Sequence, residues 1–457
     1  MADLPPTLVR LQAAIRDRRV GAGEALAAQA ARLPRLAAAT HCVAEPLPVA
    51  GDGMAAGPLA GVALAHKDIF LLQGRVPGCG VDRGHADASS RAATVIDHLT
   101  QAGAAQLATL MMAPHACGAT AENPCFSERL VNPLAATAAV GGSSGGSAVA
   151  VAAGLCYGSL GTDTSGSVRI PAATCGVLGL KPTAGLLSLA GVMPLAPSLD
   201  TVGLMARTVD DLAALWHTLA PPAESDGRAD VAEKLRIGAR LHLKELADEV
   251  AYALVDFAES AGVRTVAGGA IAEGIAEHGE LTRLAHTLLH VEAARTHGRR
   301  LQRRQLPALA AAVALPGLAV PGDWYAAALA SRPHRARAFA ARYFGDCDVL
   351  LLPALPDAVP EWDLVDTRSP AFQSGKLLRL HRFMGFVNYL GFPALVCPVA
   401  TDARGLPICV QALARPFHER ALLRFAREAA RQQFDDDGFL AARGGSQIGQ
   451  RHAGGVI

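Results

Sequence analysis

Two loops rich in glycine and serine are the parts of this chain best suited to chemistry. The run from Gly141 to Pro171 reads GGSSGGSAVAVAAGLCYGSLGTDTSGSVRIP, and a short, uncharged segment of small residues joins its two loops. Such a segment is typical of a helix and a strand packed tightly in a protein interior. Serines held at both ends of a buried element suit a nucleophile and its proton relay.

Lysine usage indicates a third residue for this chemistry. Only five lysines occur among the 42 Lys and Arg residues, so a lysine in an apolar setting indicates a chemical role that arginine cannot fill. Lys67 follows the apolar run GVALA. A desolvated lysine can act as a neutral base, whereas arginine stays charged. An ion pair with the adjacent Asp68 explains the residue equally well at this point.

Other chemistries lack their patterns. No lysine follows the loop from Gly141 to Gly146 as a phosphate-binding loop requires, and neither loop supplies GxGxxG. Gly141 to Gly145 has the letters of GxSxG, but no convincing strand leads into it. There is no HExxH and no Cys/His cluster, so we expect no metal site. His66 next to Lys67 would face the other side of a strand.

The elements around these residues predict an α/β fold. A buried strand from Val62 to His66 would place Lys67 at its end. A helix over Ser147 to Ala153 and a strand over Leu155 to Leu160 would join the two loops. Further strands and helices alternate after the polar stretch from Pro221 to Gly227, the best candidate boundary. This alternation indicates a sheet with helices on both faces.

Composition limits the partners and the compartment. The chain has 457 residues, a hydrophobic fraction of 51% and a net charge of +1, so it offers no electrostatic footprint for nucleic acid or an anionic membrane. The nine cysteines have no paired spacing, which is typical of cysteines that stay reduced. The N-terminal residues do not have the pattern of a secretory signal. We therefore expect a soluble, cytoplasmic protein. The pairs Arg299–Arg300 and Arg303–Arg304 indicate solvated helix faces.

Lys67 and the two serine loops, in that order, resemble the amidase signature family. The resemblance runs from GVALAHKD at Gly61 through GTDTSGSVRIPAATCGVLGLKPT and PLAPSLDTVG to DVLLLPALP and GLPICVQ. It implies one α/β domain over residues 1–457, with a central mixed sheet covered by helices on both faces. The signature core would span about 60–215 and a more variable helical region about 220–345.

The resemblance also implies a role for each site residue. Lys67 would be the base, Ser143, after a cis peptide bond, the relay, and Ser167 the nucleophile. The expected oxyanion hole consists of the backbone N–H groups of Thr164, Ser165, Gly166 and Ser167. The expected supporting residues are Ser144, Asp163 and Arg169. No metal or organic cofactor is implied.

The implied reaction is hydrolysis of a small-molecule amide, or of a related C–N or ester bond, through an acyl-enzyme on Ser167. Homodimers are common in the family. One alternative is the glutaminase subunit of a tRNA-dependent amidotransferase, which typically has Gln where this chain has Ile170. A second is a catalytically silent binding protein, against which the intact Lys67, Ser143 and Ser167 argue.

Three departures from the family pattern bear on the substrate. Ser165 stands where many members have Gly, Leu186 where many have Arg, and Pro114 where many have an acidic residue. For the walls of a substrate pocket we expect residues 111–126, the surroundings of Trp324, and residues 383–388.

Overall fold

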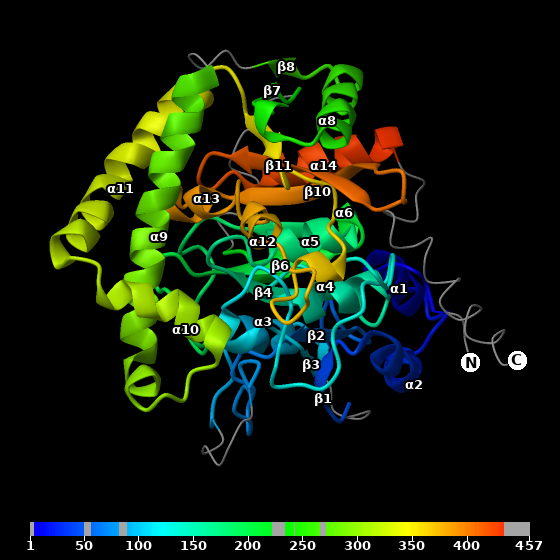
Figure 1. Ribbon diagram of the computed structural model, residues 1–457. Helices are drawn as coiled ribbons and strands as arrows, with labels where there is room; N and C mark the ends of the chain where they lie inside the picture. The colour runs from blue at the N-terminus through cyan, green and yellow to red at the C-terminus, as the bar shows by residue number, and fades with distance from the viewer. Residues whose placement is uncertain are drawn as a thin grey trace, which may run out of the picture.

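Two β-sheets with helices packed against them carry the fold of the computed structural model (Figure 1). The structure describes residues 4–49, 56–81, 89–221, 234–241, 243–265 and 271–433. Within these ranges, a mixed sheet of eight strands has the order β4-β6-β5-β10-β11-β9-β7-β8, and a sheet of three has the order β1-β3-β2. The strands are β1 (Val43–Pro46), β2 (Ala63–Lys67), β3 (Ala105–Leu110), β4 (Gly158–Asp163), β5 (Leu178–Lys181), β6 (Thr201–Ala206), β7 (Ile237–Ala239), β8 (Arg264–Thr265), β9 (Val349–Pro353), β10 (Ala394–Thr401) and β11 (Pro407–Ala414).

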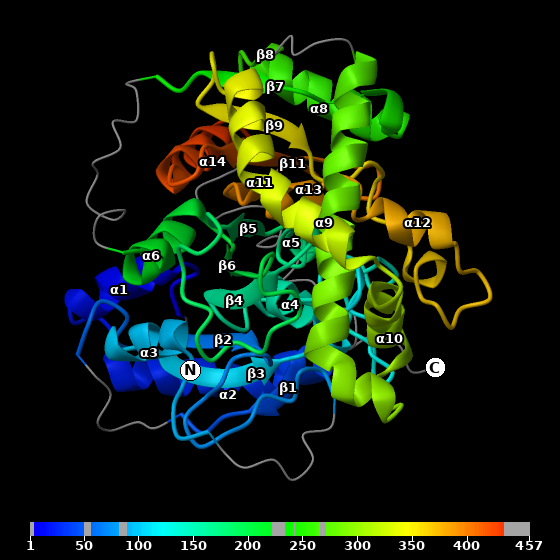
Figure 2. The same cartoon turned by 90° about the vertical axis from the view of Figure 1, so that its left-hand side faces the viewer.

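Helices cover both faces of the large sheet (Figure 2). On one face lie α6, α8 and α14, and on the other α4 and α5, with α9, α11 and α13 forming a further layer. The helices are α1 (Leu8–Arg16), α2 (Ala22–Thr40), α3 (Thr94–Gln101), α4 (Gly145–Ala152), α5 (Arg169–Cys175), α6 (Val209–Leu219), α8 (Asp248–Ser260), α9 (Ile271–Gln302), α10 (Ala308–Ala314), α11 (Gly322–Tyr343), α12 (Ser374–Arg379), α13 (Gly385–Leu390) and α14 (Glu419–Gln433).

The alternation of side chains along a strand explains how the large sheet contributes to a hydrophobic core on each of its faces. Leu351 of β9 packs in the core beneath α6, α8 and α14, while its neighbours Leu350 and Leu352 pack with α11 and α13. Successive side chains of a strand point to opposite faces, so a strand with a core on each side reads as one continuous apolar run. The expected α/β fold with a mixed sheet between helices is confirmed, and a second, three-stranded sheet joins it.

Small residues let α4 approach β3 closely. All eight residues of α4 are buried. A Cβ atom on Gly146 would lie 2.4 Å from the backbone oxygen of Met111, so only glycine fits there. This close packing fixes the loop that immediately precedes α4, which contains Ser143 and Ser144.

Local predictions from the sequence succeed where periodicity is strong. The strand expected over Val62 to His66 lies one residue later, as β2, and the helix expected over Ser147 to Ala153 is α4. The strand expected over Leu155 to Leu160 lies three residues later, as β4. The boundary expected at residues 221–227 lies, apart from Pro221, outside the described residues.

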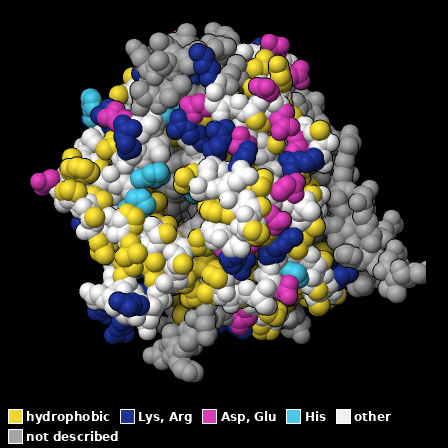
Figure 3. All heavy atoms as spheres, in the orientation of Figure 1, with side chains coloured by type: hydrophobic (Ala, Val, Ile, Leu, Met, Phe, Trp, Pro, Cys, Tyr) yellow, Lys and Arg dark blue, Asp and Glu magenta, His cyan; other side chains and the backbone are white. Residues whose placement is uncertain are grey.

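The surface and the thiols agree with the composition. Basic and acidic side chains are interspersed over the face shown in Figure 3, as a net charge of +1 leads one to expect. All nine cysteines are unpaired. No helix in the described ranges combines the length and the apolar character needed to cross a bilayer.

Candidate active site

Lys67 ends strand β2 and is 1% exposed. Its side-chain nitrogen Nζ donates hydrogen bonds to Ser143 Oγ and to Thr162 Oγ1, each at 2.8 Å. The strand pairs in parallel with β3, which places its end beside the loop that leads into α4. The lysine therefore contacts the first serine loop directly, and an ion pair with Asp68 is not needed to explain its burial.

Burial makes Lys67 a potential base. Removal from water lowers the pKa of Lys67 to about 7, while the charges of Asp200 and Asp163 act in the opposite direction. An ammonium group loses hydration when buried, which favours the neutral amine. A substantial fraction of the side chain is thus neutral at ordinary pH and can accept a proton from a hydroxyl.

The first serine loop is tied to its surroundings through the backbone. The peptide bond between Gly142 and Ser143 is cis, as the resemblance implied. Ser143 is fully buried, and its carbonyl accepts the N–H of Ala113 at 3.1 Å. The N–H of Ser144 donates to the carbonyl of Ser167 at 3.2 Å, and the hydroxyl of Ser144 donates to the carbonyl of Thr162 at 3.2 Å. Ser144 therefore joins the two serine loops.

Asp163 shapes the second serine loop, which connects β4 to α5. Its carboxylate accepts the N–H of Gly166 at 2.9 Å and the N–H of Val168 at 3.2 Å. Gly166 has a φ of +103°, and a Cβ atom there would lie 2.7 Å from Met384. Only glycine adopts this turn without strain. The turn leaves Ser167, which is 5% exposed, at the start of α5.

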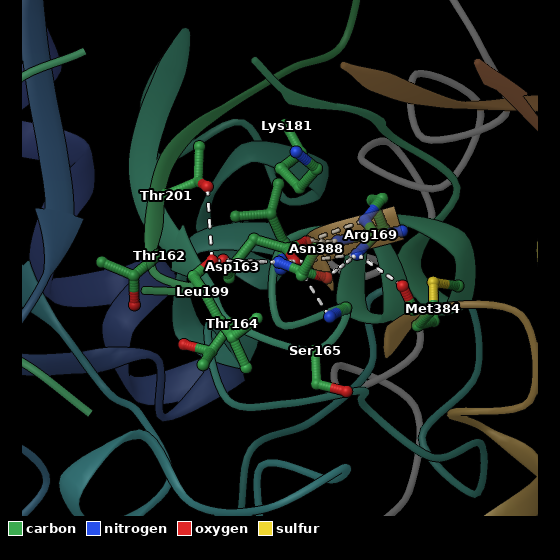
Figure 4. A network of polar contacts seen from close by, with 12 residues as sticks. Thr162, Asp163, Thr164, Ser165, Arg169, Lys181, Leu199, Thr201, Met384 and Asn388 are labelled. Carbon is green, nitrogen blue, oxygen red and sulfur yellow. Dashed lines mark hydrogen bonds and ion pairs between the residues drawn. The ribbon is translucent and has the colours of Figure 1, made fainter. Parts of the chain in front are cut away.

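A buried ion pair holds Asp163 in place. Arg169 Nη2 lies 2.9 Å from Asp163 Oδ1, and neither side chain is exposed. Burial alone would raise the pKa of Asp163, but the charge and hydrogen bonds of Arg169 keep that pKa below its usual range. Figure 4 shows Asn388 converging on the same carboxylate, to which it donates at 2.9 Å, while its oxygen accepts from Arg169 at 2.6 Å. Gln411 also accepts from Arg169.

One of the four N–H groups expected to form an oxyanion hole already has a hydrogen-bond partner. The N–H of Gly166 already donates to Asp163, so it cannot donate to a ligand in this arrangement. The N–H groups of Thr164, Ser165 and Ser167 make no such bond to the Asp163 carboxylate. These three donors follow one another around the turn, and the hydroxyl of Thr164 is fixed by Asp200 at 2.6 Å.

No hydrogen bond joins the hydroxyls of Ser143 and Ser167, although the backbone bond from Ser144 to Ser167 holds their two loops together. In the described part of the chain, the Ser167 hydroxyl makes no hydrogen bond, whereas the Ser143 hydroxyl is held by Lys67. Hydrogen bonds of catalytic groups are often long in ligand-free structures and tighten when substrate binds. The hydrogen bond between Lys67 and Ser143 allows a neutral amine to accept the proton of the Ser143 hydroxyl.

A family model described as Amidase matches residues 35–264 and 299–423. The chain belongs to the Amidase family. This family assignment makes it a hydrolase of C–N bonds.

Relatives of this Amidase-family protein include amidotransferase subunits and amide hydrolases. A glutamyl-tRNA(Gln) amidotransferase subunit from Chromohalobacter salexigens is 47% identical over 165 residues, which are 36% of this chain and 34% of that protein. The chain thus matches about a third of the length of that relative. A solved 6-aminohexanoate cyclic dimer hydrolase is 25% identical with a TM-score of 0.81, covering 94% of this chain and 98% of its own. A solved amidase is 26% identical with a TM-score of 0.80, covering 93% and 100%.

Several residues of the site were missed by reasoning from the sequence. Thr162 and Asp200 lie within quoted motifs but had no role assigned, and Gln411 ends the motif GLPICVQ. His381 also had no role assigned, and it donates from Nδ1 to the carbonyl of Ser165 at 2.8 Å. The signal was present in the motifs, but the contacts join residues that lie far apart in the sequence.

His66, the residue before Lys67, is held by a backbone hydrogen bond. His66 Nδ1 accepts the N–H of Leu160 at 2.9 Å, and burial lowers the pKa of His66 to about 3. Among the described residues, no three His, Cys, Asp or Glu side chains are arranged to hold a metal ion. Of the expected pocket walls, Trp324 is 66% exposed, and Asn388 supports Asp163 instead.

Proposed function

We propose that this protein hydrolyses the C–N bond of a small amide through an acyl-enzyme on Ser167. The observation that carries the proposal is the buried Lys67, whose nitrogen lies 2.8 Å from the Ser143 hydroxyl. A serine hydroxyl is a weak nucleophile until a base removes its proton. A lysine with a pKa lowered from 10.5 to about 7 supplies that base, a change that corresponds to roughly 5 kcal/mol of preference for the neutral form.

The first half of the reaction forms the acyl-enzyme. Neutral Lys67 takes the proton of Ser143, and Ser143 takes the proton of Ser167 as the Ser167 oxygen bonds to the amide carbon. The oxyanion that forms on the carbonyl oxygen accepts hydrogen bonds from the N–H groups of Thr164, Ser165 and Ser167. Ser143 then returns a proton to the nitrogen, the C–N bond breaks, and the amine leaves.

Water completes the cycle. It attacks the acyl carbon while the same relay accepts its proton, and the Ser167 oxygen leaves as the proton returns to it. The products are a carboxylic acid and an amine or ammonia, and the enzyme returns to its starting state. Each proton is returned within the cycle, so the chain's own residues supply every acid and base.

The test compares variants on a panel of aliphatic, aryl, urea-like and dicarboxylic amides, with ammonia release as the measurement. Wild type should hydrolyse at least one amide, while Ser167→Ala, Ser143→Ala and Lys67→Met should lose at least about 1,000-fold in kcat. Ser147→Ala is the matched control, because Ser147 is also fully buried but bonds to Leu160. Comparable activity in Ser167→Ala and wild type would rule out the proposed nucleophile.

A second candidate function comes from the sequence relatives. Curated relatives such as that of Chromohalobacter salexigens are named as subunits of a glutamyl-tRNA(Gln) amidotransferase, and these names support a glutaminase subunit better than a small-molecule amidase. Against it, the matches cover only 36% to 48% of this chain, and Ile170 stands where such subunits typically have Gln. Glutaminase activity that appears only on adding purified partner subunits would favour this second function.

The compartment is a further part of the proposal. Nine unpaired cysteines, eight of them buried, suit a reducing compartment such as the cytoplasm.

A further inference from the structure

A cavity of about 250 Å³ lies against the residues that follow Lys67 in the chain. The backbone connects its wall to the end of β2: the N–H of Ile69 donates to the carbonyl of Lys67 at 2.7 Å, and the N–H of Cys79 donates to that of Asp68 at 2.8 Å. The N–H of His115 donates in turn to the carbonyl of Cys79 at 2.8 Å. The cavity is therefore built onto the strand end that carries the proposed base.

The opposite wall comes from the C-terminal part of α9. Thr296, His297 and Arg300 line the cavity there. Burial raises the pKa of Cys79 to about 12, the charge of Asp68 raises it as well, and the charges of Arg300 and Lys67 act against that rise. Cys79 thus lines the cavity together with Arg300, and its thiol also experiences the charge of Lys67 in the active site.

His297 has unsatisfied hydrogen-bonding groups. Its side chain is 3% exposed, and neither ring nitrogen has a hydrogen-bond partner among the described residues. Its ring centre lies 5.0 Å from that of His115, which lines the same cavity. Buried polar atoms without partners are costly, so native proteins nearly always satisfy them. His297 lines the cavity, so a ligand there would lie beside these unsatisfied groups.

Arg300 adds a positive charge at the same place. Within the described ranges, no carboxylate forms an ion pair with it, and the described residues lining the cavity include no Asp or Glu. Interaction with the C-terminal end of α9 explains an arginine at this position. It does not explain why an unsatisfied histidine lies beside it. The remaining wall, with Ile69 and Met193, is apolar and suits a short hydrocarbon body.

We propose that this cavity binds a carboxylate group of the amide substrate, through Arg300 and His297, so that the protein prefers monoamides of small dicarboxylic acids. The inference rests on the proposed amide hydrolysis and specifies its substrate class. Arginine suits a carboxylate because its planar fork can donate two hydrogen bonds to the two oxygens. Thr296 and His297 lie outside the segments that the family model matches, whereas Arg300 lies near the start of the second matched segment.

The same geometry argues against glutamine as the preferred substrate. Glutamine carries an ammonium group next to its carboxylate, and the described cavity wall offers no acidic side chain to pair with that ammonium. Glutaramate is glutamine without the amino group, and pentanamide replaces the carboxylate of glutaramate by a methyl group. These three amides separate the contributions of the two charges.

The kinetic experiment measures ammonia release from malonamate, succinamate and glutaramate, each against its neutral counterpart propanamide, butanamide or pentanamide, and from glutamine. Wild type should prefer at least one half-amide over its neutral counterpart and glutaramate over glutamine.

Arg300→Gln should lower kcat/KM for the preferred half-amide by about 10- to 100-fold, with the neutral amide unchanged within about twofold. The neighbouring exposed Arg299→Gln, which does not line the cavity, should change neither. An equal loss on both amides, or no loss, would overturn the inference.

A binding experiment separates this inference from the proposed hydrolysis. Calorimetric titration of Ser167→Ala with the same half-amides should give a Kd that weakens at least about 10-fold in Ser167→Ala/Arg300→Gln. If wild type hydrolyses no amide while this difference is present, the proposed function fails and the carboxylate site stands. If the half-amides bind both variants equally or bind neither, the carboxylate site is wrong, whatever the kinetics show.

Discussion

The hydroxyl of Thr162 lies 2.8 Å from the nitrogen of Lys67, the same distance as the hydroxyl of Ser143. Thr162 is 3% exposed and belongs to β4, whereas Ser143 belongs to the loop before α4. Two elements thus fix the amine from separate directions. Both hydrogen-bond partners of the amine are neutral hydroxyls. A carboxylate partner would instead favour the charged ammonium form of the lysine.

Thr162→Val should therefore lower kcat by about 10-fold, since one hydrogen bond that orients the amine is lost while the volume is kept. KM should change little, because Thr162 is not placed to touch the substrate. Thr162→Ser is the control and should retain activity within about threefold, since it keeps the hydroxyl. Equal losses in both variants would show that packing, and not the hydrogen bond, matters at this position.

The pH dependence of kcat/KM should follow the titration of Lys67. The pKa of Lys67 is lowered by burial to about 7, and only the neutral amine can accept a proton. Activity should therefore be full above this pKa and fall as the pH decreases through about 7. In Asp200→Asn, loss of a negative charge that favours the ammonium should move the midpoint to lower pH. A midpoint that stays in place, or moves to higher pH, would contradict this account of the base.

Much of the site could be predicted from the sequence because its residues lie in short motifs. Lys67 and the two serine loops are recognisable by type and spacing, and β2 and α4 lie within two residues of the ranges expected for them. Strands β5 and β6 were not predicted, because each is a short, fully buried run without the alternation that identifies a strand.

Contacts between distant segments could not be predicted in the same way. Asn388 and Gln411 reach Arg169 only through the tertiary fold. Arg300 looked like one of a solvated pair, and it is indeed exposed, yet it also lines the cavity next to β2. A helix pattern predicts which side of a helix faces water but not which other element that side faces.

The buried pair of Asp163 and Arg169 should be important for stability as well as for the loop. Arg169→Met leaves the buried carboxylate without its cation, and we expect the free energy of unfolding to fall by about 3 to 5 kcal/mol in urea denaturation. Arg424→Gln breaks a half-exposed pair with Glu428 and is the control, with an expected loss of about 1 kcal/mol or less. Asp163→Asn/Arg169→Met should recover part of the loss. Similar losses of unfolding free energy in Arg169→Met and Arg424→Gln would contradict the proposed role of the Asp163–Arg169 pair.

The most direct test of the central claim is to map where a serine-directed fluorophosphonate reacts, using peptide mass spectrometry after labelling at several pH values. The account predicts one labelled residue, Ser167, with a labelling rate that rises as the pH increases through about 7, and no labelling in Ser167→Ala. Equal labelling of wild type and Ser167→Ala, or a label on another residue in wild type, would show that Ser167 is not the nucleophile.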